Sequence, residues 1–171
     1  MYQVKDYVVY GNEGVCQVEA IEMMDFTKSG KERPYYVLQP VNRNGKVYTP
    51  VDTKVFIRPV ISRETAEDLI KQIPSIKAET DGPTNAAILK NKYTETLQEN
   101  NCEDLIQLIK SIYHKGSVAE EKNKKMGQTD KFFLRKAEDL LYGEFAVVFN
   151  MSQGKVREYV EGKVDEISAN S

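Results

Sequence analysis

The feature that most constrains this chain is a change in its sequence pattern near residue 61. Residues 1–60 are rich in Val, Tyr and Phe, with Gly, Asn and Pro at intervals, whereas residues 61–171 place Leu, Ile, Glu and Lys at helical spacing. Strands that come first and helices that follow argue against the strand–helix alternation of a doubly wound fold. We therefore predict an α+β chain with two domains, residues 1–60 and residues 61–171.

The first domain carries five short β-type runs, at residues 7–10, 15–21, 35–38, 47–49 and 55–57. Asn44-Gly45 favours a hairpin, because both residues tolerate a positive φ angle. Pro50 limits the run before it to a sheet edge or a strand end, since proline has no N–H to donate. Five short strands in 60 residues predict a small SH3- or Tudor-like β-barrel.

The second domain carries five helical patterns and predicts an all-α helix bundle. Ser62, Thr84 and Thr129 precede three of these patterns and are plausible N-caps. Gly116 follows the apolar run of residues 102–115 and is a plausible end for that helix.

Enzyme signatures are absent from the sequence, and we expect no catalytic residues, no metal and no cofactor. The single histidine, His114, and the two cysteines, Cys16 and Cys102, cannot form a zinc site without several carboxylates. No run reaches the length of a membrane span, and the N-terminus has no secretion signal. We expect a reduced, cytoplasmic monomer that does not bind a membrane.

Basic residues are unevenly placed along a chain whose formal net charge is −2. Residues 84–136 contain 10 basic and 7 acidic residues, and residues 137–171 contain 3 basic and 7 acidic residues. The basic side chains gather around one predicted loop and the helix after it, at Lys122, Lys124, Lys125, Lys131, Arg135 and Lys136. Such a cluster can neutralise phosphates, or it can be a solvated helix face.

The tyrosines of the first domain allow two interpretations. Tyr7, Tyr10, Tyr35, Tyr36 and Tyr48 can form an aromatic cage for a cationic ligand, or they can pack within and across strands. The edge run at residues 47–49 offers a further use, since a partner strand can pair with its exposed N–H and C=O groups.

Several segments, in order, resemble the CarD/CdnL transcription regulators. They are YVVYGNEGV at residues 7–15, VEAI at 18–21, PV at 50–51, GPTN at 82–85, and Lys131 with LRKAE at 134–138 and LLYGE at 140–144. The first domain of these regulators is similar to the RNA polymerase-interacting domain of the transcription-repair coupling factor. The resemblance covers roughly residues 1–150.

The resemblance implies that the first domain docks on the RNA polymerase β subunit by strand pairing. The family's polymerase-contacting positions fall at Met24, Tyr48 and Pro50, and Val47 belongs to the same edge. Relatives often have Arg at the positions of Met24 and Tyr48, so the ion pairs that Arg would make with the β subunit are not expected here.

The resemblance also implies that the helical domain contacts promoter DNA at the upstream edge of the transcription bubble. In relatives a Trp wedges into the minor groove there and stabilises the open complex, and its position falls at Ala86. Lys131 and Lys136 match basic family positions. The predicted DNA-binding set is completed by residues of suitable charge, namely Lys90, Lys125 and Arg135.

Because an alanine methyl cannot replace an indole as a wedge, we expect weak DNA binding by the chain alone. Ile88 and Leu89 are aliphatic candidates for a wedge, but their helical spacing predicts core packing. Two alternatives stay open. One is a polymerase-binding adaptor without promoter DNA function, and the other is a Tudor-like ligand reader.

Overall fold

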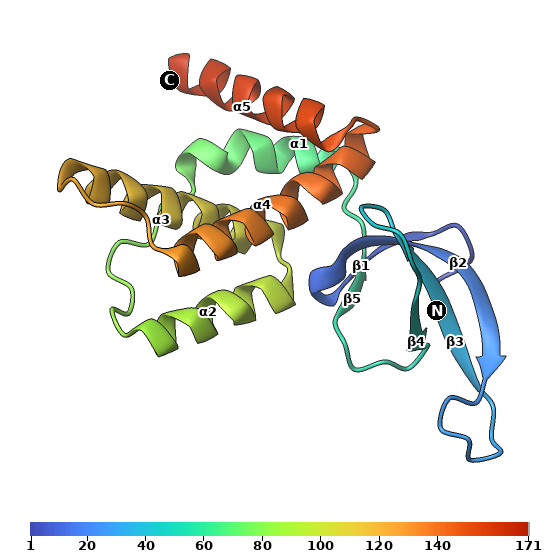
Figure 1. The fold of residues 1–171 in the computed structure, drawn as a ribbon. Coiled ribbons are helices and arrows are strands. Elements are labelled where there is room, and N and C mark those ends of the chain that lie inside the picture. The colour runs from blue at the N-terminus through green and yellow to red at the C-terminus, as the bar shows by residue number, and fades with distance from the viewer. Residues whose placement is uncertain (171) are drawn as a thin grey trace. The chain divides into compact units, whose positions relative to one another are not determined.

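The computed structural model describes residues 1–170, and it shows an α+β chain in which five strands precede five α-helices (Figure 1). The contacts divide the chain into two compact units, one from Met1 to Val60 and one that begins at Ile61. We call them the sheet unit and the helical unit.

The sheet unit is an antiparallel sheet with the strand order β4-β3-β2-β1-β5. Its strands are β1 (Tyr7–Tyr10), β2 (Gly14–Met24), β3 (Arg33–Pro40), β4 (Val47–Pro50) and β5 (Ile57–Pro59). A 3-10 turn, η1 (Gly11–Glu13), joins β1 to β2. The predicted hairpin joins β3 to β4, and Gly45 adopts a φ of 92° there. The sheet therefore follows chain order from β1 to β4, with β5 added beside β1.

The sheet is open, so the predicted closed barrel is not observed. Within the described residues β4 pairs with β3, β5 pairs with β1, and the two outer strands do not pair with each other. Both outer strands are short and end in proline, β4 at Pro50 and β5 at Pro59, and proline cannot donate a ladder hydrogen bond. The chain between them turns away at once, because Thr53 N–H donates to the Pro50 carbonyl at 3.0 Å.

One face of the sheet holds a small apolar core. Its buried members are Val8, Cys16, Val18, Tyr36 and Leu38. Residues directly opposite each other in paired strands share a face, and successive residues alternate between faces. Val18 lies opposite Leu38, and Leu38 lies opposite Val47, which explains how β2, β3 and β4 contribute to one core.

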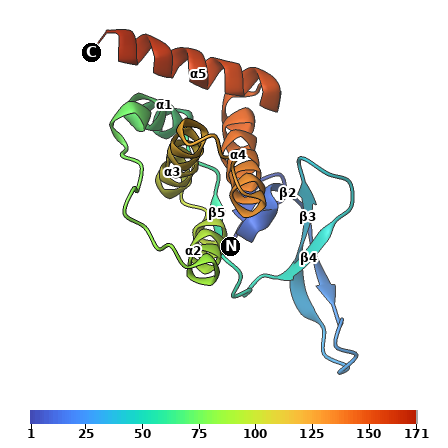
Figure 2. The ribbon, with the colours of Figure 1, turned by 60° about the vertical axis from the view of Figure 1, so that its left-hand side comes forward.

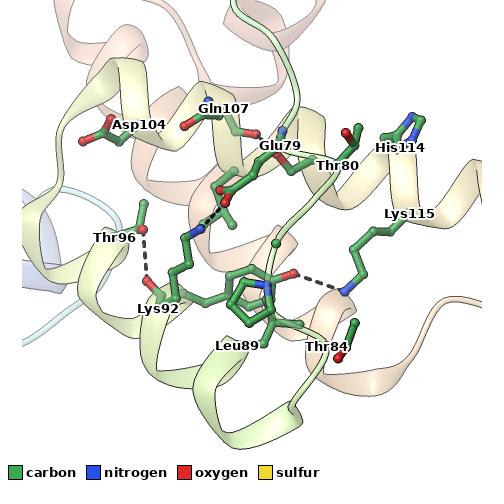
Figure 3. Close-up of a pocket in the computed structure, with 15 residues that line it drawn as sticks. Glu79, Thr80, Thr84, Leu89, Lys92, Thr96, Asp104, Gln107, His114 and Lys115 are labelled. Atoms are coloured by element: carbon green, nitrogen blue, oxygen red, sulfur yellow. Dashed lines mark hydrogen bonds and ion pairs between the residues drawn. The ribbon is translucent and has the colours of Figure 1, made fainter.

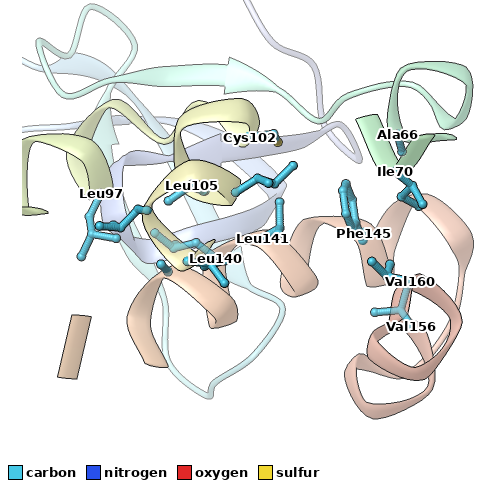
Figure 4. Packing of buried hydrophobic residues seen from close by; sticks show 14 of the residues in the cluster. Ala66, Ile70, Leu97, Cys102, Leu105, Leu140, Leu141, Phe145, Val156 and Val160 are labelled. Atoms are coloured by element: carbon cyan, nitrogen blue, oxygen red, sulfur yellow. The ribbon is translucent and has the colours of Figure 1, made fainter. Parts of the chain in front are cut away.

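The helical unit consists of α1 (Arg63–Gln72), the 3-10 turn η2 (Ile73–Ser75), α2 (Ala86–Glu99), α3 (Cys102–Glu121), α4 (Gln128–Phe149) and α5 (Gln153–Ala169). All five α-helices contribute to one large apolar core, in which Leu105, Ile112 and Phe145 are fully buried (Figure 4). Figure 2 shows α3 and α4 packed side by side at the centre of this unit. Because one side of each helix packs against this core, the residues on the opposite side are exposed.

The helix boundaries correct three sequence predictions. Asn85, rather than Thr84, caps α2, and its Oδ1 accepts from the N–H groups of Ala87 (3.0 Å) and Ile88 (3.2 Å). Gly127, rather than Thr129, is the N-cap of α4. Gly116 lies inside α3, which continues to Glu121. None of the described helices is both long enough and apolar enough to cross a membrane.

Candidate functional site

The open edge of β4 presents the main chain of Tyr48. Val51 N–H donates to the Pro34 carbonyl at 3.1 Å, and Tyr36 lies opposite Thr49 in the register. In an antiparallel pair, hydrogen-bonded and non-hydrogen-bonded residue pairs alternate. The main-chain groups of Thr49 therefore face β3, and the N–H and C=O of Tyr48 face away from it. Tyr48 thus offers one donor and one acceptor to a strand that approaches the edge.

Three of the four residues predicted to bind the polymerase share one face of the sheet. Tyr48 lies opposite Val37, and Pro50 lies opposite Tyr35. Met24, at the end of β2, falls on the same face by the alternation of side chains. We call this face, with Met24, Tyr48 and Pro50, the outer face.

Val47, the fourth predicted residue, lies on the opposite face. Its side chain packs against the apolar core of the sheet unit, and its main-chain groups face β3. The expectation that Val47 contacts a partner directly is therefore not supported by its placement. The sequence predicted the strand that contains Val47 but not the face on which its side chain lies, because a shift of one residue along a strand reverses the direction of the side chain.

Phe26 completes the outer face and was not among the predicted residues. Its ring centroid lies 4.9 Å from that of Tyr35 and 5.7 Å from that of Tyr48, both in edge-on geometry. Phe26 and Tyr48 are half exposed, whereas Tyr35 is buried. The only sequence signal for Phe26 is that a phenylalanine lies in the polar segment between β2 and β3. Its contacts with Tyr35 and Tyr48 could not be predicted, because these residues are distant in sequence.

Asp25 organises the loop that carries Phe26. Its carboxylate accepts from Ser29 N–H at 3.1 Å, from Gly30 N–H at 2.7 Å and from the Thr27 hydroxyl at 3.0 Å. These bonds form around the residue directly before Phe26. They hold the loop in one conformation and so restrict the position of the exposed ring.

The tyrosines of the sheet unit do not converge on one cage. Tyr35 and Tyr48 lie on the outer face, whereas Tyr36 is buried on the core face, where its hydroxyl accepts from Tyr2 N–H at 3.0 Å. The Tyr10 hydroxyl donates to Thr49 Oγ1 at 3.0 Å. Packing and hydrogen bonding account for these side chains, which weakens the interpretation as a ligand reader.

The residues predicted to contact DNA are all exposed. Lys131, Arg135 and Lys136 lie on the first half of α4, on the side away from the buried Phe133 and Ala137. Lys125 lies in the connection before α4, and the other two predicted residues, Ala86 and Lys90, belong to α2. Lys131 and Arg135 make no ion pair within the described residues, so their charges are available to a ligand.

The start of α2 differs from the expectation at one position. Ala86 is the first residue of the helix, directly after its cap, and is exposed. Leu89 packs against the core as expected, but the Ile88 side chain is 55% exposed. The prediction of core packing for Ile88 is therefore wrong, because the core side of α2 runs through Leu89, Tyr93 and Leu97.

A polar contact joins α2, α3 and the start of α4. The Tyr93 hydroxyl donates to Asp130 Oδ1 at 3.0 Å, and Lys115 Nζ lies 3.0 Å from Asp130 Oδ2. The ring of Tyr93 also packs against Phe133, with centroids 5.2 Å apart. Burial, with the hydrogen bond to Asp130, raises the pKa of Tyr93 far above the ordinary tyrosine range. This contact fixes the beginning of α4, and with it the basic side chains that follow.

A cavity of about 530 Å³ lies between the segment that precedes α2 and the helices α2 and α3 (Figure 3). Two ion pairs lie at this cavity, Lys92 with Glu79 and Lys115 with Asp130. Glu79 N–H donates to Ser111 Oγ at 2.7 Å, which ties the segment to α3. His114 also borders the cavity. The arrangement shows internal pairing of charges rather than a nucleophile beside a base.

Both cysteines are buried, and they form no disulfide among the described residues. Burial is the main cause that raises the pKa of Cys16 to about 12, with a further contribution from Glu13. Cys102 Sγ donates to Glu144 Oε1 at 3.2 Å inside the helical unit. Among the described residues, no group of three or more His, Cys, Asp or Glu side chains is arranged to hold a metal ion.

Residues 2–61 match the family model described as the CarD-like/TRCF RID domain. The match covers nearly all of the sheet unit, including the β4 edge and the outer face, and it ends where the helical unit begins. The RID domain is an RNA polymerase-interacting domain. This chain therefore contains a CarD-like/TRCF RID domain, followed by a unit of five helices.

Proposed function

We propose that the protein is a transcription regulator that binds the RNA polymerase β subunit through the β4 edge and contacts promoter DNA through its helical unit. The observation that carries this proposal is the match of the sheet unit to an RNA polymerase-interacting domain. In this proposal the protein has no catalytic role, and it acts by holding the polymerase and the DNA at the upstream edge of the transcription bubble together.

The β4 edge supports recognition by strand addition. In a strand of the β subunit that pairs with Tyr48, a carbonyl oxygen accepts from the Tyr48 N–H and an N–H donates to the Tyr48 C=O. The main chain of Tyr48 therefore takes part in both hydrogen bonds. The neighbouring side chains, Met24, Phe26 and Pro50, are uncharged. Apolar contact therefore supplies the selectivity that charged residues would otherwise give.

The helical unit supports a DNA contact that is weak when the protein is alone. The exposed cations Lys131, Arg135 and Lys136 can neutralise phosphates. Binding to the polymerase raises the effective concentration of this unit at the promoter, so a weak contact suffices. A sub-micromolar affinity of the free protein for duplex DNA at physiological salt would contradict this part of the proposal.

The edge contact is tested by two substitutions at one position. Tyr48→Pro removes the N–H that faces the partner, whereas Tyr48→Ala removes the side chain and keeps the N–H. Loss of that hydrogen bond leaves a partner carbonyl unsatisfied, which costs about 1–3 kcal/mol. Tyr48→Pro should weaken the affinity for core RNA polymerase about tenfold or more, and Tyr48→Ala should weaken it less.

The identity of the subunit is tested by a photocrosslinking amino acid in place of Phe26. Crosslinks to the β subunit support the proposal, and crosslinks confined to another subunit contradict it. Circular dichroism of each variant checks that the sheet is intact. If the native protein does not bind core polymerase at all, the proposed function is wrong.

A second candidate function follows from Ala86. The small side chain at the start of α2 favours a polymerase-binding adaptor that does not stabilise the open promoter complex. The lifetime of that complex, measured with and without the protein and with Ala86→Trp, separates the candidates. If the native protein is a regulator, it changes the lifetime and protects upstream DNA in footprints. If it is an adaptor, the native protein changes neither, and only the Ala86→Trp variant has an effect.

A further inference from the structure

Phe132 on α4 is exposed although the residue after it is in the core. The Phe132 side chain is 56% exposed and that of Phe133 is 4% exposed. The two rings meet at 89° with centroids 5.2 Å apart, so Phe133 supports the base of the exposed ring. A large apolar ring on the outside of a helix does not contribute to the core, and its surroundings indicate what it can bind.

On α4, those surroundings are basic on the side toward the C-terminus. Arg135 and Lys136, three and four residues after Phe132, are exposed on the same side of the helix, and Lys131, directly before Phe132, is exposed as well. Lys136 Nζ lies 5.9 Å from the centroid of the Phe132 ring. Residues 122–136 contain six basic residues and one acidic residue, Asp130.

That one acidic group is already engaged. Asp130 binds Lys115 at 3.0 Å and accepts from the Tyr93 hydroxyl at 3.0 Å. Its charge is therefore directed to α2 and α3 and does not neutralise the cations beside Phe132. The result is an exposed aromatic ring among unpaired positive charges, which is the combination that binds nucleic acid by stacking and phosphate contact together.

We infer that Phe132 stacks on unpaired bases of DNA while Lys131, Arg135 and Lys136 bind the adjacent phosphates. This inference rests on the proposed function and adds the residue and the form of DNA to it. A ring stacks on a base only where the face of that base is accessible, so DNA with an unpaired stretch is the ligand and closed duplex is a poorer one.

Other exposed apolar side chains of the helical unit are less suitable. Ala86 has too little surface to cover a base, and Ile88 has no π face. Tyr113 is exposed, but its hydroxyl donates to Glu138 at 3.2 Å and accepts from Arg157 at 3.3 Å. These bonds hold the Tyr113 ring against α4 and α5. Phe132 combines exposure, an aromatic face and adjacent free cations.

The first test measures binding of the full chain to two fluorescent DNAs of equal length, one fully paired and one with an unpaired stretch in its centre. Fluorescence anisotropy at about 50 mM salt makes weak binding measurable. Phe132→Ala should weaken binding to the bubble DNA about fivefold or more and change binding to the duplex much less. Phe56→Ala, the same change at an exposed phenylalanine of the sheet unit, should change neither.

The second test uses the absence of tryptophan from the chain. Phe132→Trp places a single indole at the proposed contact, and base stacking quenches its fluorescence. Phe56→Trp is the matched reporter. Bubble DNA should quench the indole at position 132 and leave the indole at position 56 unchanged, and neither substitution enters a core.

Three outcomes would overturn the inference. They are equal affinity of Phe132→Ala and the native chain for bubble DNA, equal quenching of both reporters, and no binding of the native chain to either DNA at this salt concentration. Binding of the native chain to core polymerase is measured on the same preparations. If polymerase binding persists when any of these outcomes occurs, the inference fails and polymerase binding stands. If polymerase binding is absent, the proposed function fails.

Discussion

The sheet unit and the helical unit are stabilised in different ways. Among the described residues, the buried cluster of the sheet unit has five members and that of the helical unit has eighteen. The sheet unit therefore depends strongly on its strand ladders, and its open ladder at β4 is also the recognition element that we propose. The helical unit is stabilised by side-chain burial, which leaves the outward sides of its helices free to carry charge. In the proposed function, main-chain groups serve recognition in the sheet unit and side chains serve it in the helical unit.

The charges of the two units follow the same division. Two basic side chains near the β4 edge pair with acidic ones: Arg33 with Asp52 at 2.9 Å and Lys46 with Glu19 at 2.8 Å. On α4, by contrast, Lys131 and Arg135 make no ion pair within the part of the chain that the structure describes. In the proposed function, the β4 edge thus offers a partner the uncharged residues Tyr48 and Pro50, and α4 offers unpaired cations.

The largest expected effect is the destabilisation of the helical unit alone by a substitution in its core. Phe145 is fully buried in the helical core, and Phe145→Ala should cost about 3–5 kcal/mol of the free energy of unfolding. Each unit contains one buried cysteine, Cys16 or Cys102, whose alkylation requires opening of that unit. Phe145→Ala should accelerate alkylation of Cys102 about a hundredfold or more and leave Cys16 nearly unchanged.

The reciprocal variant is the control for that measurement. Leu38→Ala removes a buried side chain of the sheet core and should accelerate alkylation of Cys16 alone. Mass spectrometry after alkylation distinguishes the two sites. If either substitution accelerates both cysteines equally, the two cores open as one cooperative unit and the comparison above is wrong.

The next effect concerns an ion pair in the helical unit whose carboxylate is nearly buried. Arg157 lies 2.7 Å from Glu138, and the exposed fractions of the two side chains are 43% and 10%. Arg157→Met leaves the carboxylate unpaired and should cost about 1–3 kcal/mol at neutral pH. This is less than the loss from a fully buried pair, because Arg157 is partly solvated. Glu138→Gln should cost less, since the amide can still accept from Tyr113.

The pH dependence of that loss follows from the pKa of Glu138. Burial raises this pKa above its ordinary value of 4.5, and Arg157 and Tyr113 oppose part of the rise. A carboxyl whose pKa is raised by folding stabilises the fold below its unfolded pKa, and this contribution is lost as the pH rises through the folded pKa. The cost of Arg157→Met should therefore grow from pH 4 to pH 7, as measured by urea denaturation. A constant cost would contradict this assignment.

A smaller effect tests the contrast in charge directly. The slope of log K against log salt for bubble DNA should fall by about 1 for Lys131→Gln and by about 1 for Arg135→Gln. Lys71→Gln on α1 is the matched control and should leave the slope unchanged. Binding of the native protein to polymerase should depend on salt much less, because its proposed contact is uncharged. Steep salt dependence of polymerase binding would contradict the proposed contrast between an uncharged polymerase contact and a charged DNA contact.

The local periodicity of apolar residues was sufficient to predict which segments are strands and which are helices. Alternation in β2 and apolar spacing in α3 and α4 predicted strands before helices, because each pattern is local and each element buries one side. The β4 edge followed from Pro50, a local signal too. The resemblance supplied Met24, Tyr48 and Pro50, and the register of the sheet shows why these three share a face.

Features that depend on distant partners were not predictable in this way. Barrel closure requires β4 and β5 to meet, and no local pattern specifies that pairing. Phe26 and Phe132 were missed because their importance lies in exposure and in neighbours brought by the fold. Ile88 was assigned to the core side and is exposed, because a single residue of phase decides which side of a helix a side chain takes. The sequence did not indicate on which face of the sheet Val47 lies, for the same reason.

Gly116 carries the smallest effect and shows why a glycine in a helical pattern is ambiguous. It lies within α3, where glycine costs about 1 kcal/mol relative to alanine. A Cβ at this position would lie 2.8 Å from Met126 Cε, the flexible end of a side chain from the segment before α4. Gly116→Ala should therefore gain less than the full helical contribution, because Met126 must move. In a Met126→Ala background this obstacle is absent. Gly116→Ala should therefore stabilise the Met126→Ala variant more than it stabilises the native protein. Equal effects of Gly116→Ala in both backgrounds, measured by urea denaturation, would show that Met126 does not restrict this position.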